Sequence, residues 1–353
     1  MTHAPATTPR LPVDLVTGFL GSGKTTLINA VLRDSAFAGA MVIVNEFGEV
    51  GLDHLLISSA DDQVLLLDSG CLCCAASGTL RDTLIDLFAR RASGSVPAFD
   101  RIIVETSGLA HPAPMVASLL GDSALVPRCQ LSQVLTLVDA GNGPSTLDRY
   151  AEARRQVAFA DRLVISKTDT AGASQIEALR QRLAGINAHA PIALWRQGES
   201  PAHLFEAPEA APHGRGADAA AWLRGPLRPQ YADGSSEPDA HGSAFRQITT
   251  HVLPIAGAVD WATYAAWTQA LASRFGPRLL RCKGLLALGD GAAPWAVQGV
   301  QGYFAPPRRL PAWPGGAPAG FLVCIGESIG RDELDAVVSP ASSSPSTSER
   351  PSP

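Results

Sequence analysis

The stretch "GFLGSGKTT", residues 18–26, limits the possible folds of this chain more than any other feature. It continues an apolar run that begins at residue 13, and it leads into a helical pattern at 24–34. Its glycines, lysine and threonine fit the spacing G-x-x-x-x-G-K-[ST]. In a loop of this kind, backbone N–H groups surround phosphate oxygens, and the helix N-terminus adds positive potential. The sequence therefore predicts a P-loop at the edge of a parallel α/β sheet.

We assign nucleotide binding in this loop to Gly18, Gly21, Ser22, Gly23, Lys24, Thr25 and Thr26. The Lys24 ammonium is expected to reach the β- and γ-phosphates, and the Thr25 hydroxyl is expected to hold Mg²⁺. Only three of the 28 Lys and Arg residues are lysines, at positions 24, 167 and 283. A lysine ammonium is a compact charge on a flexible stem, whereas an arginine guanidinium is a planar group. Because the two are not interchangeable, the three lysine positions are candidates for specific roles.

A second motif, "VISKTDT" at 164–170, indicates which base is bound. Lys167-x-Asp169 matches the [N/T/S]-K-x-D pattern of guanine-binding proteins. The Asp169 carboxylate can accept two hydrogen bonds from the N1–H and N2–H₂ edge of guanine, whereas adenine offers no such donor pair. The Lys167 stem would pack along the base. Ser166 stands where Asn is usual, which is expected to weaken contacts with the base.

A third motif, "RIIVETSG" at 101–108, supplies the catalytic candidates. In P-loop NTPases an acidic residue at the end of a strand supports the Mg²⁺ site, and here that residue is Glu105. Gly108 would place a backbone N–H against the γ-phosphate. We therefore assign catalysis to Lys24, Glu105 and Gly108. All three motifs directly follow strand candidates, as expected for ligand sites at the carboxyl ends of parallel strands.

The first part of the chain alternates short apolar runs with helix-like stretches, which is typical of a parallel α/β sheet. The strand candidates are residues 13–19, 41–47, 64–68, 101–107, 133–140, 162–167 and 191–196. The helix-like stretches between them include 24–34, 79–91, 146–160 and 174–185.

A smaller α+β domain is expected after a Pro-, Gly-, Ala- and Asp-rich segment. It comprises a strand from 245, a helix around 259–275, and strands near 279–288 and 295–303. The Ser- and Pro-rich end of the chain has little to bury and is expected to be disordered. The resulting division is a flexible N-terminus 1–10, a P-loop GTPase domain 11–200, a linker 201–244, a C-terminal domain 245–330 and a disordered tail 331–353.

The segment "SGCLCC", residues 69–74, follows the strand candidate at 64–68 and holds Cys71, Cys73 and Cys74. Clustered thiols are soft ligands that suit Zn²⁺ and, less distinctively, other late transition metals. Glu46 and His111 also follow strands on the same edge, and we include both as candidate zinc ligands. The rival hypothesis for the cluster is a thiol redox switch, which lacks a thioredoxin-like sequence context here.

Charge and hydropathy make some classes of partner less favoured. The net charge of −5 argues weakly against nucleic acid, and no apolar run reaches the length of a membrane span. The N-terminus lacks an apolar signal core, so we expect a cytoplasmic protein. Thiols stay reduced there, which favours metal binding over a disulfide in the cluster. Cys129, Cys282 and Cys324 are scattered and are expected to pack as small hydrophobic residues.

Taken together, "TGFLGSGKTTLIN", "VNEFGEVGLD", "GCLCC", "VETSGLAHP" and "SKTD" resemble the CobW-type metallochaperone GTPases. Residues 281–313 also resemble that family's C-terminal domain. The resemblance implies GTP-driven delivery of a transition metal, most often zinc, to a client metalloprotein, with Cys71, Cys73 and Cys74 as the thiolate motif. His111 departs from the family, where Asp is frequent. A His-rich metal-storage stretch is also unmatched, so cobalt, nickel or iron delivery for cobalamin or nitrile hydratase remains open.

Three function hypotheses follow from these residues. The first is a slow GTPase, with GTP and Mg²⁺ as cofactors, whose cycle loads and releases Zn²⁺. The second is a P-loop kinase acting on a small molecule, with incidental cysteines. The K-x-D motif and the lack of a recognisable acceptor-binding lid favour the first. A nucleotide-gated redox sensor is a third alternative.

Overall fold

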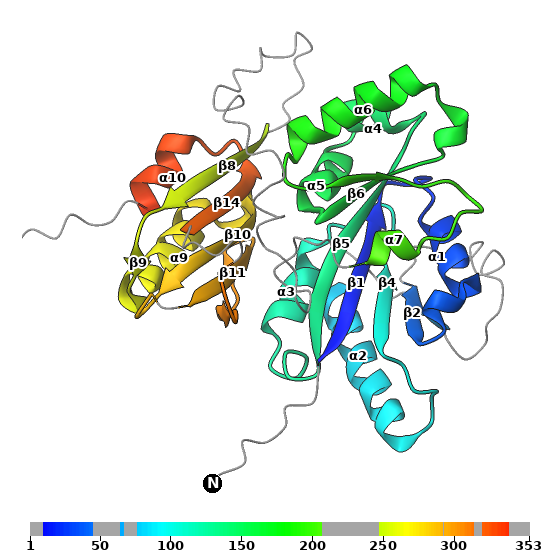
Figure 1. Cartoon of the computed structure of the whole chain (residues 1–353), viewed down its shortest axis with the longest axis horizontal. Helices are drawn as coiled ribbons and strands as arrows, with labels where there is room; N and C mark the ends of the chain where they lie inside the picture. Colours follow the sequence, from blue (N-terminus) through cyan, green and yellow to red (C-terminus); the bar gives the residue numbers. More distant parts are fainter. Residues whose placement is uncertain are drawn as a thin grey trace, which may run out of the picture.

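The computed structural model describes residues 10–44, 64–66, 76–206, 247–291, 293–313 and 320–338. These residues form two parts, each built on a seven-stranded sheet. Figure 1 shows the first part in blue to green and the second in yellow to red. The predicted architecture, a P-loop α/β sheet followed by a smaller C-terminal α+β domain, is confirmed.

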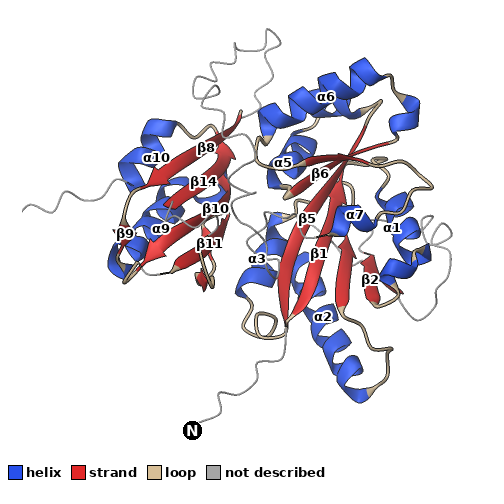
Figure 2. Cartoon of the chain, viewed as in Figure 1, coloured by secondary structure: helices blue, strands red, loops and turns tan. Residues whose placement is uncertain are grey.

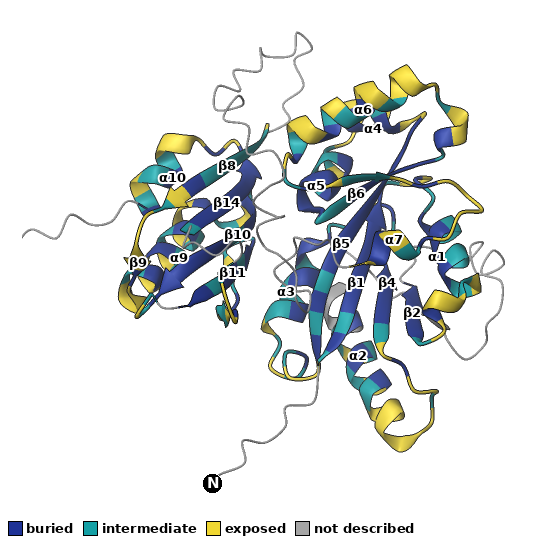
Figure 3. Cartoon of the chain, viewed as in Figure 1, coloured by how far each residue is buried: buried dark blue, intermediate teal, exposed yellow. Residues whose placement is uncertain are grey.

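The first sheet is parallel throughout, with strand order β3-β2-β4-β1-β5-β6-β7. Its strands are β1 (Leu11–Gly18), β2 (Ala40–Val44), β3 (Val64–Leu66), β4 (Arg101–Glu105), β5 (Cys129–Asp139), β6 (Arg162–Ser166) and β7 (Ile192–Leu194). All seven strand candidates are confirmed. Strands β1, β2 and β4 are buried almost along their whole length, because helices cover both faces of the sheet (Figures 2 and 3).

Helices of the first domain connect these strands. They are α1 (Lys24–Arg33), α2 (Ala76–Ser93), α3 (Ala113–Gly121), α4 (Gly143–Arg149), α5 (Ala151–Phe159), α6 (Ala173–Ile186) and α7 (Ala202–Phe205), with 3₁₀ turns η1 (Ser35–Phe37) and η3 (Thr168–Thr170). The prediction of one helix over 146–160 is wrong. Tyr150 is extended there, with φ −120° and ψ 118°. Its ring stacks on Phe19 of the P-loop at 4.5 Å between centroids, a tertiary contact that the local pattern does not encode.

The first residues of the expected linker, 201–244, pack on the P-loop domain. Leu204 and Phe205 of α7 are buried, and the Phe205 ring meets Phe37 edge-on at 5.1 Å. Gln133 of β5 donates a hydrogen bond to the Leu204 carbonyl at 3.0 Å. Residues 207–246 lie outside the described part of the chain.

The second sheet is largely antiparallel, in the order β12-β11-β10-β14-β8, with β13 on β11 and β9 on β10. Its elements are β8 (Ile248–Ile255), β9 (Ala258–Val259), α9 (Trp261–Phe275), η5 (Gly276–Arg278), β10 (Leu279–Leu288), β11 (Pro294–Val300), β12 (Tyr303–Phe304), β13 (Arg308–Arg309), β14 (Gly320–Glu327) and α10 (Arg331–Val338). The predicted tail began too early. Residues 331–338 form α10, since Leu334 and Val338 are buried in the cluster that includes α9.

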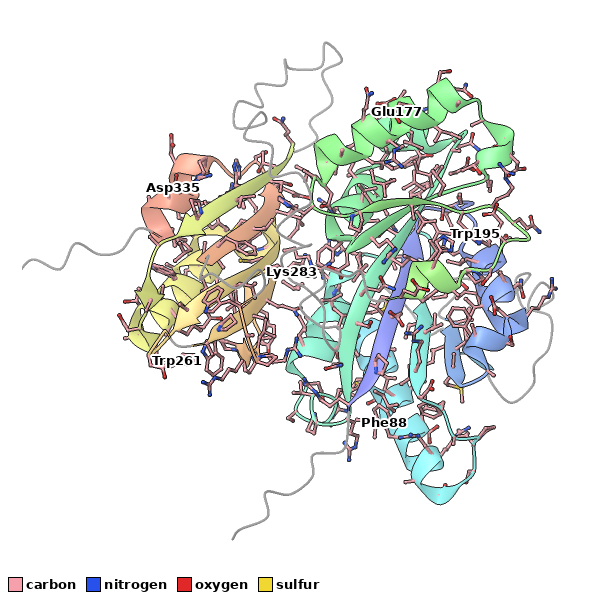
Figure 4. All side chains as sticks on the ribbon, in the orientation of Figure 1. Phe88, Glu177, Trp195, Trp261, Lys283 and Asp335 are labelled. Atoms are coloured by element: carbon pink, nitrogen blue, oxygen red, sulfur yellow. The ribbon has the colours of Figure 1, made fainter. Side chains whose placement is uncertain are left out.

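The two domains share a hydrophobic core. Helices α9 and α10 belong to the cluster on one face of the second sheet. Side chains on the other face of β10, β11 and β14 belong to the cluster that contains α2, α3 and the end of α5, where Val323 and Ile325 join Phe159. Figure 4 labels Lys283 on β10 at this boundary between the domains. The second domain is therefore packed directly against the helices that flank the nucleotide motifs.

Candidate nucleotide and metal site

The P-loop forms as predicted between β1 and α1. Gly18 has φ +143°, and a Cβ atom there would lie 2.4 Å from the Leu137 carbonyl oxygen, so no other residue fits. Lys24 is only 8% exposed, and its ammonium donates hydrogen bonds to the carbonyls of Gly18 at 3.0 Å and Phe19 at 3.4 Å. The loop thus holds the lysine charge over its own backbone, where a phosphate would bind.

The residues assigned to Mg²⁺ and to hydrolysis are in contact. The Thr25 hydroxyl donates a hydrogen bond to Glu105 Oε1 at 3.0 Å. Glu105 ends β4 and is paired in register with Val16 of β1 and Val44 of β2. A hydroxyl and a buried carboxylate side by side are the hard oxygen donors that fit Mg²⁺ and its coordinated water.

Gly108 lies against the P-loop. A Cβ atom on Gly108 would meet Leu20 Cδ2 at 2.6 Å and the Leu20 nitrogen at 2.8 Å, so the close approach of the two loops requires glycine. The Gly108 carbonyl accepts a hydrogen bond from Gln156 of α5 at 3.1 Å. Sequence reasoning missed Gln156. The available signal was a single amide directly before the small and apolar run "VAFA".

The base motif is tied to the P-loop by its serine. Ser166 Oγ donates to the Ser22 carbonyl at 2.6 Å and lies 3.3 Å from that of Val138. The substitution of Asn by Ser therefore keeps a direct link between the base-recognition loop and the phosphate loop. Asp169, in η3, is exposed, so its carboxylate is open to a ligand.

Lys167 adopts a left-handed backbone conformation, with φ 53°, and its ammonium pairs with Asp139 Oδ2 at 2.9 Å. Burial alone would raise the pKa of Asp139, but hydrogen bonds from Lys167 and the backbone N–H of Asn142 outweigh it and lower the pKa. Lys167, Asp139 and Gln156 line a cavity of about 190 Å³ beside P-loop residues 19–22. Sequence reasoning also missed Asp139.

The predicted zinc ligands Glu46, Cys71, Cys73 and Cys74 lie outside the described residues. The strands that lead to them are described. Val44, the last residue of β2, is paired with Glu105 on one side and with Leu66, the last residue of β3, on the other. Within the described ranges, no three His, Cys, Asp or Glu side chains are grouped so as to hold a metal ion.

The geometry does not favour His111 as a metal ligand. Its Nδ1 accepts a hydrogen bond from the Ala113 backbone N–H at 3.1 Å, which places the proton of the neutral ring on Nε2. Burial, and then the charge of Arg155, lower the pKa of His111 to about 4. The ring packs edge-on against Phe159 of α5. His111 thus packs against α5, which also contacts the second domain.

The scattered cysteines are buried, as predicted. Burial raises the pKa of Cys129 to about 11. Cys282 and Cys324 are paired across β10 and β14, with their sulfur atoms 3.7 Å apart, and their mutual hydrogen bond and burial raise the pKa of Cys282. Cys129 and Cys282 therefore resist ionisation, which makes them poor metal ligands, and Cys324 is buried against Cys282.

The parallel sheet, the P-loop with its contacting glutamate and the K-x-D loop define a P-loop NTPase with a guanine-type base motif. Residues 12–193 match the family described as CobW/HypB/UreG, nucleotide-binding domain, and residues 248–340 match the cobalamin synthesis protein CobW C-terminal domain. The chain belongs to the CobW family.

Known relatives resemble both domains. The zinc chaperone YjiA of Escherichia coli K12 is 32% identical over 328 residues, which cover 92% of this chain and 97% of YjiA. The crystal structure of Zn(II)-bound YjiA GTPase superimposes with a TM-score of 0.63 and 26% identity, over 94% of this chain and 98% of that chain. The structure of a Zn(II)-bound YjiA triple mutant, with one glutamate and two cysteines changed to alanine, gives a TM-score of 0.65 and 25% identity. The match covers 94% of this chain and 98% of that chain.

Among the described helices, none combines the length and apolar character needed to cross a membrane.

Proposed function

We propose that this protein is a GTPase that binds Zn²⁺ at Cys71, Cys73 and Cys74 and passes it to a client metalloprotein in a GTP-dependent way. The observation that carries the proposal is the pairing of strand ends: β3 and β2, which lead to the cysteines and to Glu46, end beside Glu105 of the nucleotide site. The likeness to a zinc chaperone supports the choice of metal. GTP and Mg²⁺ are the cofactors, zinc is the cargo, and neither nucleic acid nor membrane is a partner.

The hydrolytic roles follow from the contacts of the site. Lys24 and the P-loop backbone would hold the phosphates, and Thr25 and Glu105 would hold Mg²⁺, which when bound neutralises charge on the β- and γ-phosphates. The Gly108 N–H would bind the γ-phosphate. We place the protein in the cytoplasm, where a reduced Cys-x-Cys-Cys motif is maintained.

Guanine selectivity gives a first prediction. Asp169→Asn should weaken GTP binding by ~1–3 kcal/mol, because the amide replaces an acceptor of two hydrogen bonds from the guanine edge. Xanthosine triphosphate carries an oxygen in place of the N2 amino group and should bind the variant better than it binds the wild type. Fluorescent-nucleotide competition measures both. Asp332→Asn, an exposed site on α10, is the matched control. Displacement of GTP by equimolar ATP in the wild type would disprove guanine recognition.

The length of the chain after β3 is sufficient for the cysteines to reach the nucleotide, which supports the proposal. Neighbouring strands lie ~4.8 Å apart, so Leu66 is roughly 10 Å from Glu105 across β2. Cys71 follows Leu66 by five residues, and an extended chain covers at most ~3.6 Å per residue, or about 18 Å. Glu46 lies two residues beyond Val44. A loop that closes on the γ-phosphate can therefore bring Glu46 towards the thiolates and complete a tetrahedral site.

Coupling between zinc and nucleotide is the second prediction. Zinc affinity should be ~5- to 150-fold higher with a non-hydrolysable GTP analogue than with GDP, and zinc should tighten the analogue by the same factor. Zinc is titrated against a competing chelator with the analogue, with GDP and without nucleotide. Equal affinities in the three states would refute the coupling.

The zinc titration needs matched variants and a measured stoichiometry. Cys73→Ser should lower affinity in every nucleotide state, whereas Cys129→Ala removes a buried thiol outside the motif and should not. The YjiA triple mutant is zinc-bound although two of its cysteines are replaced. The number of zinc ions bound per chain must therefore be measured, so that a second zinc site is distinguished from the cysteine motif. Intact zinc binding in Cys73→Ser would place the metal elsewhere.

A further inference from the structure

Gln156 is a buried amide on a helix whose other buried residues are apolar. It is 1% exposed, and its neighbours on the buried face of α5 are Ala153, Val157, Ala158 and Phe159. Burying an amide is unfavourable unless it is hydrogen-bonded. Its Nε2 donates to the carbonyl oxygens of Gly108 and Ala110, both at 3.1 Å. Since carbonyls only accept, the group that faces them must be the NH₂, and both of its hydrogens serve one loop.

We propose that Gln156 is a positioning residue for GTP hydrolysis, which holds the Glu105–Ala110 loop so that the Gly108 N–H meets the γ-phosphate. This inference rests on the proposed GTPase function. The start of the loop is fixed by the Glu105 contact with Thr25 and by the Thr106 N–H bond to Val16 at 2.9 Å. The end is fixed by Gln156. Gly108 already lies against Leu20 of the P-loop. Small movements of the Glu105–Ala110 loop would therefore change the distance from the Gly108 N–H to the γ-phosphate.

The helix that carries Gln156 is anchored on two further sides. The Gln156 carbonyl accepts a hydrogen bond from Thr136 of β5 at 3.1 Å. Arg155 pairs with Glu327 of β14, and Arg281 of β10 donates to the Phe159 carbonyl. Figure 1 shows α5 between the first sheet and the second domain. The C-terminal domain therefore braces the helix that positions the catalytic loop, so it contributes to the nucleotide site without touching the nucleotide.

The test replaces the donor while keeping the shape of the side chain. Gln156→Met has the same length and no N–H, and Gln156→Leu is a second variant in case the first fails to fold. We expect kcat for GTP to fall roughly 10- to 100-fold, the scale of a small misplacement of a reacting group. The GDP dissociation constant should stay within about 3-fold, while the preference for a non-hydrolysable GTP analogue over GDP should fall, because only GTP has the γ-phosphate.

Gln133→Leu is the matched control. Gln133 is equally buried, and its Nε2 donates to the Leu204 carbonyl in α7, away from the loop. It should keep the wild-type kcat and GTP-to-GDP preference. Wild-type kcat and preference in a folded Gln156 variant would overturn the inference, and so would equal losses of GDP and GTP-analogue affinity, which mark a structural role. If the wild type hydrolyses no GTP, the proposed function fails, and the nucleotide preference of the variants still tests the loop.

Discussion

Replacing Lys24 with alanine is expected to lower GTP affinity by about 100-fold or more. The Lys24 ammonium bonds the P-loop carbonyls of Gly18 and Phe19, and the residue is 8% exposed, so the charge is already in place before a phosphate binds. Each charged hydrogen bond contributes ~1.5–3 kcal/mol, and two such bonds to the β- and γ-phosphates exceed the ~2.8 kcal/mol that corresponds to 100-fold. Titration calorimetry with GTP and Mg²⁺ measures the loss.

Lys24→Arg separates charge from shape. It keeps the positive charge but places a planar, wider group in a loop that closes around a narrow stem, so we expect a loss nearly as large as for alanine. Arg33→Ala removes a charge from the opposite end of α1, ~14 Å away along the helix, and should change affinity less than 2-fold. GTP binding within 5-fold of the wild type in Lys24→Ala would exclude the P-loop assignment.

The parts of the site that could be predicted from sequence are those whose chemistry is local. Gly18, Lys24 and Thr25 lie in one short segment whose spacing is set by the nucleotide phosphates and Mg²⁺ that it binds. Lys167 and Asp169 are likewise two residues apart, and the strands that precede these motifs are uniform apolar runs. Because parallel strands end at one edge, the strand assignments together with the P-loop NTPase pattern predicted the meeting of Thr25 with Glu105.

The residues that sequence reasoning missed act through partners far along the chain. Gln156 is 48 positions from Gly108, and Asp139 is 28 positions from Lys167. The break between helices α4 and α5 at Tyr150 depends on stacking with the Phe19 ring of the P-loop. Helix α10 forms because Leu334 packs in the hydrophobic cluster that contains α9. In each case a polar or amphipathic residue has several local conformations available, and a tertiary contact selects one.

The boundary between the domains holds a charge cluster that sequence motifs did not reveal. Asp161 accepts hydrogen bonds from Arg281 Nη2 at 2.7 Å, from Lys283 Nζ and from the Val134 N–H at 2.9 Å. All three charged side chains are nearly buried. Burial alone would raise the pKa of Asp161, but the charges of Arg281 and Lys283 outweigh it and hold the pKa well below its usual range.

The two cations are not equivalent partners. Burial, and then repulsion by Arg281, lower the pKa of Lys283 to about 8 despite its contact with Asp161. The site as a whole therefore disfavours the charged lysine while it favours the charged aspartate. Arg281 bonds Oδ2 of Asp161 and Lys283 bonds Oδ1, so the carboxylate offsets the repulsion between the two cations. Removal of the carboxylate then leaves two buried cations together.

Asp161→Asn is accordingly expected to destabilise the protein by ~3–5 kcal/mol at pH 7, the usual cost of breaking a buried ion pair from one side. Asp148→Asn, which breaks an exposed pair with Arg182, is the matched control and should cost ~0–1 kcal/mol. Urea unfolding measures both. Lys283→Met alone should cost less than Asp161→Asn, because Arg281 and the Val134 N–H remain on Oδ2 of Asp161 and only the bond to Oδ1 is lost. Adding it to Asp161→Asn should recover part of the loss, with a coupling of ~0.5–3 kcal/mol.

The pH dependence of these variants follows from the direction of each shift. The folded pKa of Asp161 is depressed, so its stabilisation is present above its unfolded pKa of ~3.9 and is lost as the pH falls through the folded pKa. Lys283 has a lowered folded pKa, so between pH ~8 and ~10.5 the unfolded chain binds more protons and stability rises with pH. Without Asp161, Lys283 loses its proton at still lower pH, and the deficit of Asp161→Asn should shrink from pH 7 to pH 9. A deficit below 1 kcal/mol at pH 7, or one that grows with pH, would show that Asp161 does not hold the two cations at the domain boundary.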